Sequence, residues 1–139
     1  MSLVRKTIVA AAVSGITLTG VVGTANAVVA PKQVVKSFNV YSPTKKTWTS
    51  KASGWVKFSA KSTSVTGLAL NKSKTAVTLV VVIYKGGTVI ATKTVVIKGA
   101  VKNSHGLVAG HAGVALLAAK PATKVTVKIG TGAPQVVTP

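Results

Sequence analysis

The sequence predicts an all-β fold, a single β-sandwich of about seven strands that follows a signal peptide. Three observations lead to this prediction. Apolar and polar residues alternate in short segments, most cleanly in TKVTVKI at residues 123–129, and this period of two is typical of a half-buried strand. Turn signals recur every dozen residues or so, and the strand-favouring residues Val and Thr are abundant. A closed barrel is the alternative architecture.

The first 27 residues are expected to be a signal peptide that is removed on export. Arg5 and Lys6 form a positive start, an apolar run covers residues 7–23, and ANA at residues 25–27 is a small-x-small cleavage site. A retained transmembrane anchor is the alternative, because the run approaches the roughly 20 residues that span a bilayer. The cleavage motif favours the signal peptide, so we expect a secreted, or cell-wall-associated, mature chain without a transmembrane segment.

The mature chain is expected to have three parts. Residues 28–36 form an extended N-terminal segment, because Pro31 prevents a helix start. Residues 37–130 form the β-sandwich domain, and residues 131–139 form a flexible tail rich in Gly and Pro.

Within the domain, the first half alternates between strand and turn patterns. Strands are expected at residues 37–41, 55–61 and 63–71, with a polar loop or short edge strand at residues 44–54 and a turn at residues 71–74. In the strand at residues 55–61, the period of two places Val56 and Phe58 inside and Trp55 outside.

A hairpin is expected over residues 76–97, with Gly86 and Gly87 at a turn that needs positive φ. Its first strand is apolar on both faces, which predicts a central position with packing on each side. Its second strand carries Lys93, which we expect near a sheet edge, or snorkelling outward along its stem.

The remaining segments complete the predicted order. Residues 101–106 resemble a loop, and residues 123–129 form the last strand. Residues 108–119 contain good helix formers, but Gly110 and Gly113 and the β-rich context favour a strand.

The charge of this chain is entirely positive. It has 139 residues with 18 Lys and Arg, no Asp or Glu and no Cys. Removal of residues 1–27, which hold Arg5 and Lys6, leaves 112 residues with a formal charge of +16 instead of +18. Spread over roughly 6,000 Å² of surface, these charges lie well beyond the Debye length of about 8 Å. Stability must therefore come from packing and strand pairing, and attraction to polyanions requires local crowding of lysines.

The missing carboxylates exclude several chemistries. Without Asp or Glu the chain cannot form the carboxylate pair of a glycoside hydrolase, an aspartic dyad, a Ser-His-Asp triad or a carboxylate site for calcium or magnesium. We therefore expect no enzyme and no cofactor. His105 and His111 are the only imidazoles, and two histidines fall short of a four-ligand zinc site. We expect them in loops, with copper, nickel or haem ligation as a weak alternative.

One segment combines aromatic rings with lysines in a way that suggests a ligand groove. Such a groove stacks rings on a polymer while ammonium groups meet phosphate or sulfate. The plain alternative is that the rings fill the core and the lysines form a solvated face. The candidate binding residues are Trp48, Trp55, Lys45, Lys46, Lys51, Lys57 and Lys61.

Residues 65–129 carry a motif that resembles a known family. The segment starts with the pattern V-x-G-x-x-x-N-x-S and continues with a long apolar strand that ends in Ile-Tyr, a Gly turn and a Val-Ile strand. This order of features resembles the bacterial FxLYD-type and related immunoglobulin-like extracellular domains. The matching residues are Val65, Gly67, Asn71, Ser73, Ile83, Tyr84, Gly87, Val89 and Ile90. Lys85 stands where that family has Asp, and Val81 where it has Phe. The resemblance implies an immunoglobulin-like sandwich and an accessory role at the cell envelope.

Three functions follow as hypotheses. The first is a non-enzymatic binding or adhesion module for anionic polymers, such as teichoic acid or a glycosaminoglycan. The second is a cationic antibacterial effector that acts on anionic membranes. The third is a carrier of a small anionic ligand such as a tetrapyrrole. Specific nucleic-acid readout is not expected, because the mature chain has no Arg and no basic run.

Overall fold

The computed structural model describes residues 33–139. All regular structure in this part of the chain is β-strand. The predicted signal peptide and the first part of the extended N-terminal segment lie outside the described residues. The strands are β1 (Val34–Ser42), β2 (Ser50–Phe58), β3 (Thr63–Asn71), β4 (Val77–Lys85), β5 (Thr88–Ile97), β6 (Val101–Asn103), β7 (Gly106–Val108), β8 (Gly110–Ala118), β9 (Lys124–Ile129) and β10 (Gln135–Val137).

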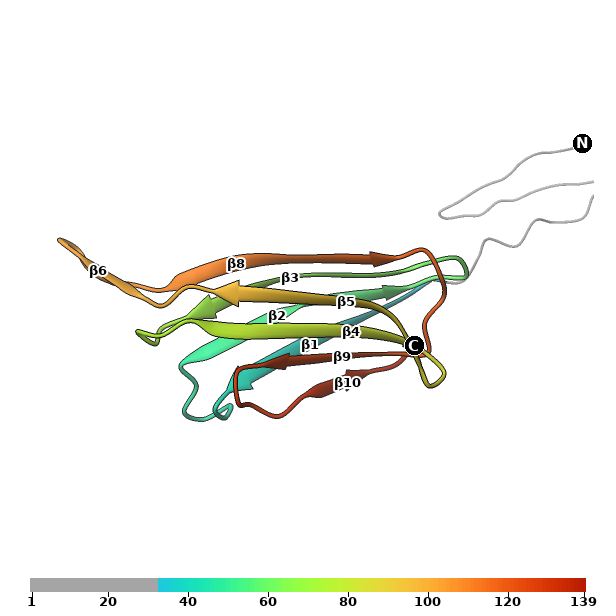
Figure 1. Cartoon of the computed structure of the whole chain (residues 1–139), viewed down its shortest axis with the longest axis horizontal. Helices are drawn as coiled ribbons and strands as arrows, with labels where there is room; N and C mark the ends of the chain where they lie inside the picture. Colours follow the sequence, from blue (N-terminus) through green and yellow to red (C-terminus); the bar gives the residue numbers. More distant parts are fainter. Residues whose placement is uncertain (1–32) are drawn as a thin grey trace, which may run out of the picture. The chain divides into compact units, whose positions relative to one another are not determined.

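Two four-stranded antiparallel sheets face each other across one core (Figure 1). The first sheet has the order β1-β2-β3-β8 and the second has the order β10-β9-β4-β5. Strands β6 and β7 form a separate two-stranded hairpin that projects beyond one end of the sheets (Figure 1). The expectation of an all-β, sandwich-like fold is therefore confirmed.

The structure corrects the expected number and bounds of strands. The described residues hold ten strands instead of about seven. Residues 101–106, expected to form a loop, supply β6 and the start of β7, and β1 begins within the expected N-terminal segment. Strands β6 and β7 pair with each other but have only 3 residues each, which is too short for an alternating pattern to reveal them.

The predicted flexible tail at residues 131–139 is also wrong in part. Val137 pairs with Val125 and is only 5% exposed, so this segment closes the edge of the second sheet. Pro134 directly precedes β10, and a proline at the start of an edge strand costs no ladder hydrogen bond.

The central position predicted for β4 is confirmed, because β4 pairs with both β5 and β9. The predicted packing on both faces is wrong. Leu79, Val81 and Ile83 are fully buried, whereas Val80 and Val82 on the other face are partly exposed. In a two-layer antiparallel sandwich one face of each sheet meets solvent, and β-branched residues are compatible with that face.

Phe38 fills the core over a pair of glycines. Gly54 lies opposite Phe38 on β1 and opposite Gly67 on β3. A Cβ at Gly54 would lie 2.9 Å from the Phe38 ring and 2.0 Å from the Thr66 carbonyl oxygen. The absence of side chains at both positions therefore lets the ring pack directly against the backbone of β2 and β3.

The expected hairpin, the strand at β8 and the inward face of β9 are confirmed. Gly86 has φ 62° in the turn between β4 and β5, a conformation that favours glycine. Val125, Val127 and Ile129 are fully buried. Lys93 lies on the edge strand β5, as predicted.

Candidate functional site

The first candidate site lies at the end of the sandwich where β2 begins and β3 ends. We call it the Trp48 cluster and define it as Tyr41, Trp48, Lys51 and Lys72. Tyr41 and Lys51 are cross-strand partners on β1 and β2. Trp48 comes from the loop between β1 and β2, and Lys72 directly follows β3.

Two ammonium groups contact the one indole ring of this cluster. The Lys72 Nζ lies 3.8 Å from the Trp48 ring centroid and the Lys51 Nζ lies 4.7 Å from it. Both distances are within the range of a cation–π contact. The Tyr41 ring packs beside the indole with its centroid 6.5 Å away. Trp48 is thus half-buried beneath two cations.

Backbone hydrogen bonds position the two loops of the cluster. The Lys72 amide donates to the Thr49 carbonyl oxygen at 2.7 Å, and the Thr49 amide donates to the Ser42 carbonyl oxygen at 2.8 Å. Lys72 is therefore held next to Trp48 although 24 positions separate them in the chain.

Asn71 anchors the turn that carries Lys72. This side chain is fully buried and its Nδ2 donates to the carbonyl oxygens of Thr75, Ile97 and Lys98 at 2.8 to 3.2 Å. Its Oδ1 accepts from the Ser50 and Ser73 hydroxyls and from the Ser73 amide. One side chain thereby links β2, β3, β5 and the loop between β3 and β4.

The electrostatics of the cluster are unbalanced. The distance between the two ammonium nitrogens is at most the sum of their distances to the Trp48 ring centroid. This upper limit is close to the Debye length of about 8 Å at physiological ionic strength. No Asp or Glu exists in the sequence to neutralise them. The indole quadrupole offsets only part of this charge, so an external anion would be attracted here.

The structure separates the candidate residues predicted from sequence. Trp48 and Lys51 meet in the cluster, and Lys45 and Lys46 are exposed in the same loop as Trp48. Lys61 lies in the loop between β2 and β3, at the opposite end of β2. Lys72 was missed, because only the register of β2 against β3 reveals its position.

Trp55 and Lys57 lie on β2 away from the cluster. Trp55 is 60% exposed on the outer face of the first sheet, whereas Phe58 is 5% exposed and Val56 is fully buried. The predicted directions of these three side chains are confirmed. Lys57 is exposed two residues after Trp55.

The other lysines are distributed over both ends and both sheets. Lys74 and Lys98 lie near the end that holds the Trp48 cluster, whereas Lys85 and Lys120 lie near the opposite end. Lys124 contacts the Tyr84 ring at 4.6 Å from its centroid, on the outer face of the second sheet. Among the cation–π contacts of residues 33–139, Trp48 is the ring that two lysines share.

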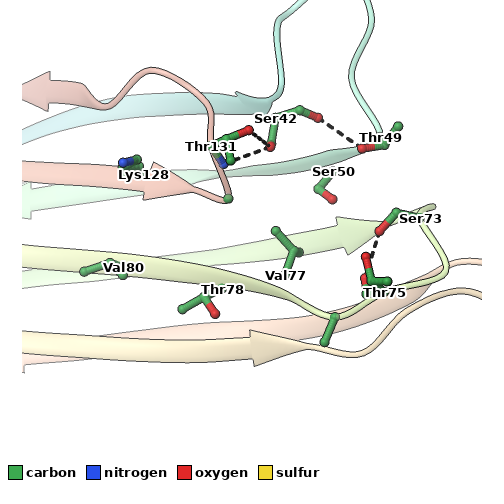
Figure 2. Close-up of a pocket in the computed structure, with 12 residues that line it drawn as sticks. Ser42, Thr49, Ser50, Ser73, Thr75, Val77, Thr78, Val80, Lys128 and Thr131 are labelled. Atoms are coloured by element: carbon green, nitrogen blue, oxygen red, sulfur yellow. Dashed lines mark hydrogen bonds between the residues drawn. The ribbon is translucent and has the colours of Figure 1, made fainter.

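A hydroxyl-lined opening of about 510 Å³ lies beside the cluster, between the ends of the two sheets (Figure 2). Many of its hydroxyls bond to one another or to the backbone. The Ser42 Oγ accepts from the Thr131 amide at 3.2 Å and lies 3.5 Å from the Thr131 hydroxyl. The Ser73 hydroxyl donates to the Thr75 carbonyl oxygen at 2.8 Å. Lys128 is the charged residue of the lining. Because many of the hydroxyls are already hydrogen-bonded within the protein, we interpret them as part of the structure and not as ligand contacts.

The two histidines lie in different elements. His105 lies in the turn between β6 and β7, as expected, but the expected loop position of His111 is wrong, because His111 is exposed on strand β8. Within residues 33–139, no group of three or more His, Cys, Asp or Glu is placed to hold a metal ion. The same part of the chain contains no helix long and apolar enough to cross a membrane.

Comparisons with known proteins found no family model, no curated protein and no solved structure that matches this chain.

Proposed function

We propose that this chain is an exported, non-enzymatic module that binds anionic polymers of a cell envelope or of a host surface. The observation that carries this proposal is the Trp48 cluster, in which two ammonium groups meet over one ring in a chain without acidic side chains. Phosphate, sulfate or carboxylate groups of a polymer supply the missing counter-charge, and charge-assisted contacts are the stronger kind.

We also propose that the sandwich is immunoglobulin-like. In such folds, strands of each sheet are joined by connections that cross between the sheets. Here β3 pairs with β8 in one sheet while β4 pairs with β9 in the other. The connections from β3 to β4 and from β8 to β9 both change sheet, which supports this assignment.

The test compares two double variants of equal charge. Lys51→Gln with Lys72→Gln changes the cluster, whereas Lys61→Gln with Lys120→Gln changes loops at the opposite end. Binding to purified teichoic acid and to heparin is measured by titration at several salt concentrations. We expect the cluster variant to lose about tenfold in affinity, as removal of charge-assisted contacts implies, and the control variant to lose about threefold or less. Equal losses would show that only total charge matters and would reject the proposed site.

A second candidate function, action on anionic membranes, is favoured by the β6–β7 hairpin. Val101 is 66% exposed, Leu107 is 59% exposed and Val108 is 48% exposed, and Lys102 is the cross-strand partner of Leu107. Exposed apolar side chains beside a cation suit a lipid interface. Dye release from phosphatidylglycerol vesicles, abolished by Leu107→Ser, would support this function. Intact vesicles would reject it.

A further inference from the structure

The outer face of the first sheet holds a depression of about 540 Å³ around Trp55. Two neighbouring cross-strand rows border it. One row contains Ser37, Trp55 and Thr66, and the next contains Asn39, Ser53 and Leu68. Phe38, Gly54 and Gly67 also contribute to its lining.

The apolar part of the depression is open to solvent. Trp55 is 60% exposed and Leu68 is 51% exposed. Trp48 is covered by two ammonium groups, but among residues 33–139 no cation or aromatic ring stacks on Trp55. Its indole is therefore free to receive a flat ligand, which is a common use of an exposed aromatic residue with apolar neighbours.

The polar part of the depression is neutral. Ser37, Ser53 and Thr66 offer hydroxyls, and Asn39 offers an amide. Each of these groups both donates and accepts hydrogen bonds. A pyranose ring has a C–H face that stacks on an indole and hydroxyl edges that exchange such hydrogen bonds. The depression thus combines the two kinds of contact that a sugar ring needs.

Lysines flank the depression along β2. Lys51 precedes Ser53 by two residues and Lys57 follows Trp55 by two residues, and all four side chains lie on the outer face. A strand rises about 3.4 Å per residue, so the two lysines are attached roughly 20 Å apart. A ligand that stacks one ring on Trp55 and contacts both lysines needs acidic groups on each side of that ring, and an acidic polymer offers them.

We propose that the depression binds a pyranose ring of an anionic polysaccharide, with Trp55 stacked on the ring and Lys51 and Lys57 contacting its acidic groups. This inference rests on the proposed function, because Lys51 also belongs to the Trp48 cluster. It narrows the ligand class from polyanions in general to acidic glycans. Polyanions without sugar rings bind through charge alone, and nucleic acids stack a base instead.

The test uses three probes, a heparin decasaccharide, inorganic polyphosphate of similar charge and single-stranded DNA. Trp55→Ala is the test variant. Leu117→Ala is the matched control, because Leu117 is 68% exposed on the same face but outside the depression. Circular dichroism checks that each variant folds. A second readout is the indole emission of Trp48→Phe, in which Trp55 is the remaining tryptophan.

We expect Trp55→Ala to weaken heparin binding by about tenfold, the usual cost of truncating a central interface tryptophan. Polyphosphate binding should change by less than about twofold, and Leu117→Ala should change neither. In Trp48→Phe, the decasaccharide should shift or quench Trp55 emission and polyphosphate should not.

Unchanged heparin binding in Trp55→Ala, or equal losses for heparin and polyphosphate, would overturn the sugar-ring inference. A selective loss for DNA would overturn it in favour of base stacking. Each of these results leaves the proposed function intact, as long as the cluster variant still binds polyanions more weakly than its control. If wild type binds none of the probes at physiological salt, the proposed function itself fails.

Discussion

Replacement of Asn71 with Ala should destabilise this protein more than any other single polar substitution at the end of the sandwich that holds the Trp48 cluster. The side chain is fully buried and takes part in six hydrogen bonds. Its Nδ2 has two hydrogens for three carbonyl oxygens, and its Oδ1 has two lone pairs for three donors. The contacts therefore amount to about four full hydrogen bonds.

The magnitude follows from this count. A net contribution of about 1 kcal/mol per hydrogen bond predicts a loss of about 4 kcal/mol in the free energy of unfolding. The Ser73 hydroxyl keeps its bond to the Thr75 carbonyl oxygen, which reduces the expected loss to about 3 kcal/mol. This is a large share of the roughly 5–15 kcal/mol that stabilises a typical domain.

Urea unfolding, followed by tryptophan emission and far-ultraviolet circular dichroism, measures this loss. Ser73→Ala is the matched control, and it should cost about 1 kcal/mol. It removes one donor to Asn71, the Ser73 hydroxyl, but keeps the Ser73 backbone amide and the buried Asn71 side chain. A loss below about 1.5 kcal/mol for Asn71→Ala, or a loss equal to that of the control, would refute the assignment of Asn71 as the anchor of this end.

Two further predictions concern charge. Because the chain has no Asp or Glu, no side-chain carboxylate is protonated in acid. The unfolding free energy of a variant with both histidines replaced by Gln should therefore change by less than about 1 kcal/mol between pH 7 and pH 3, and a steep fall on urea titration would contradict this. Lys93 on the edge strand β5 is the cross-strand partner of buried Val81 on β4, yet Lys93 itself is exposed. A charge on the inward side of an edge strand opposes pairing with another chain. Lys93→Val should form dimers or aggregates in light scattering at concentrations where Lys120→Val stays monomeric, and equal behaviour of the two variants would argue against this role.

Local patterns located most of the regular strands. The bounds of β2 were wrong, because it starts at Ser50, within the expected loop or short edge strand, ends at Phe58 and lies between β1 and β3. The alternation in β9 placed Val125 and Val127 inside, and the glycine pair between β4 and β5 located the hairpin turn. The direction of Trp55 also followed from the period of two. These features depend on residues that are neighbours along the chain, so the sequence alone revealed them.

The candidate sites depend on residues that are distant along the chain. Trp48 gains Lys72 only when β2 and β3 align in register, and the Trp55 depression needs β1 on one side and β3 on the other. The tail became β10 because β9 offered an unpaired edge.

The sequence by itself determined the all-β class, the alternating faces and the absence of acidic chemistry, because composition and a period of two are local properties of the chain. Only the tertiary structure decided which lysines meet a ring and which stay apart. Cross-strand register sets those distances, and the period of two within a single strand does not encode that register.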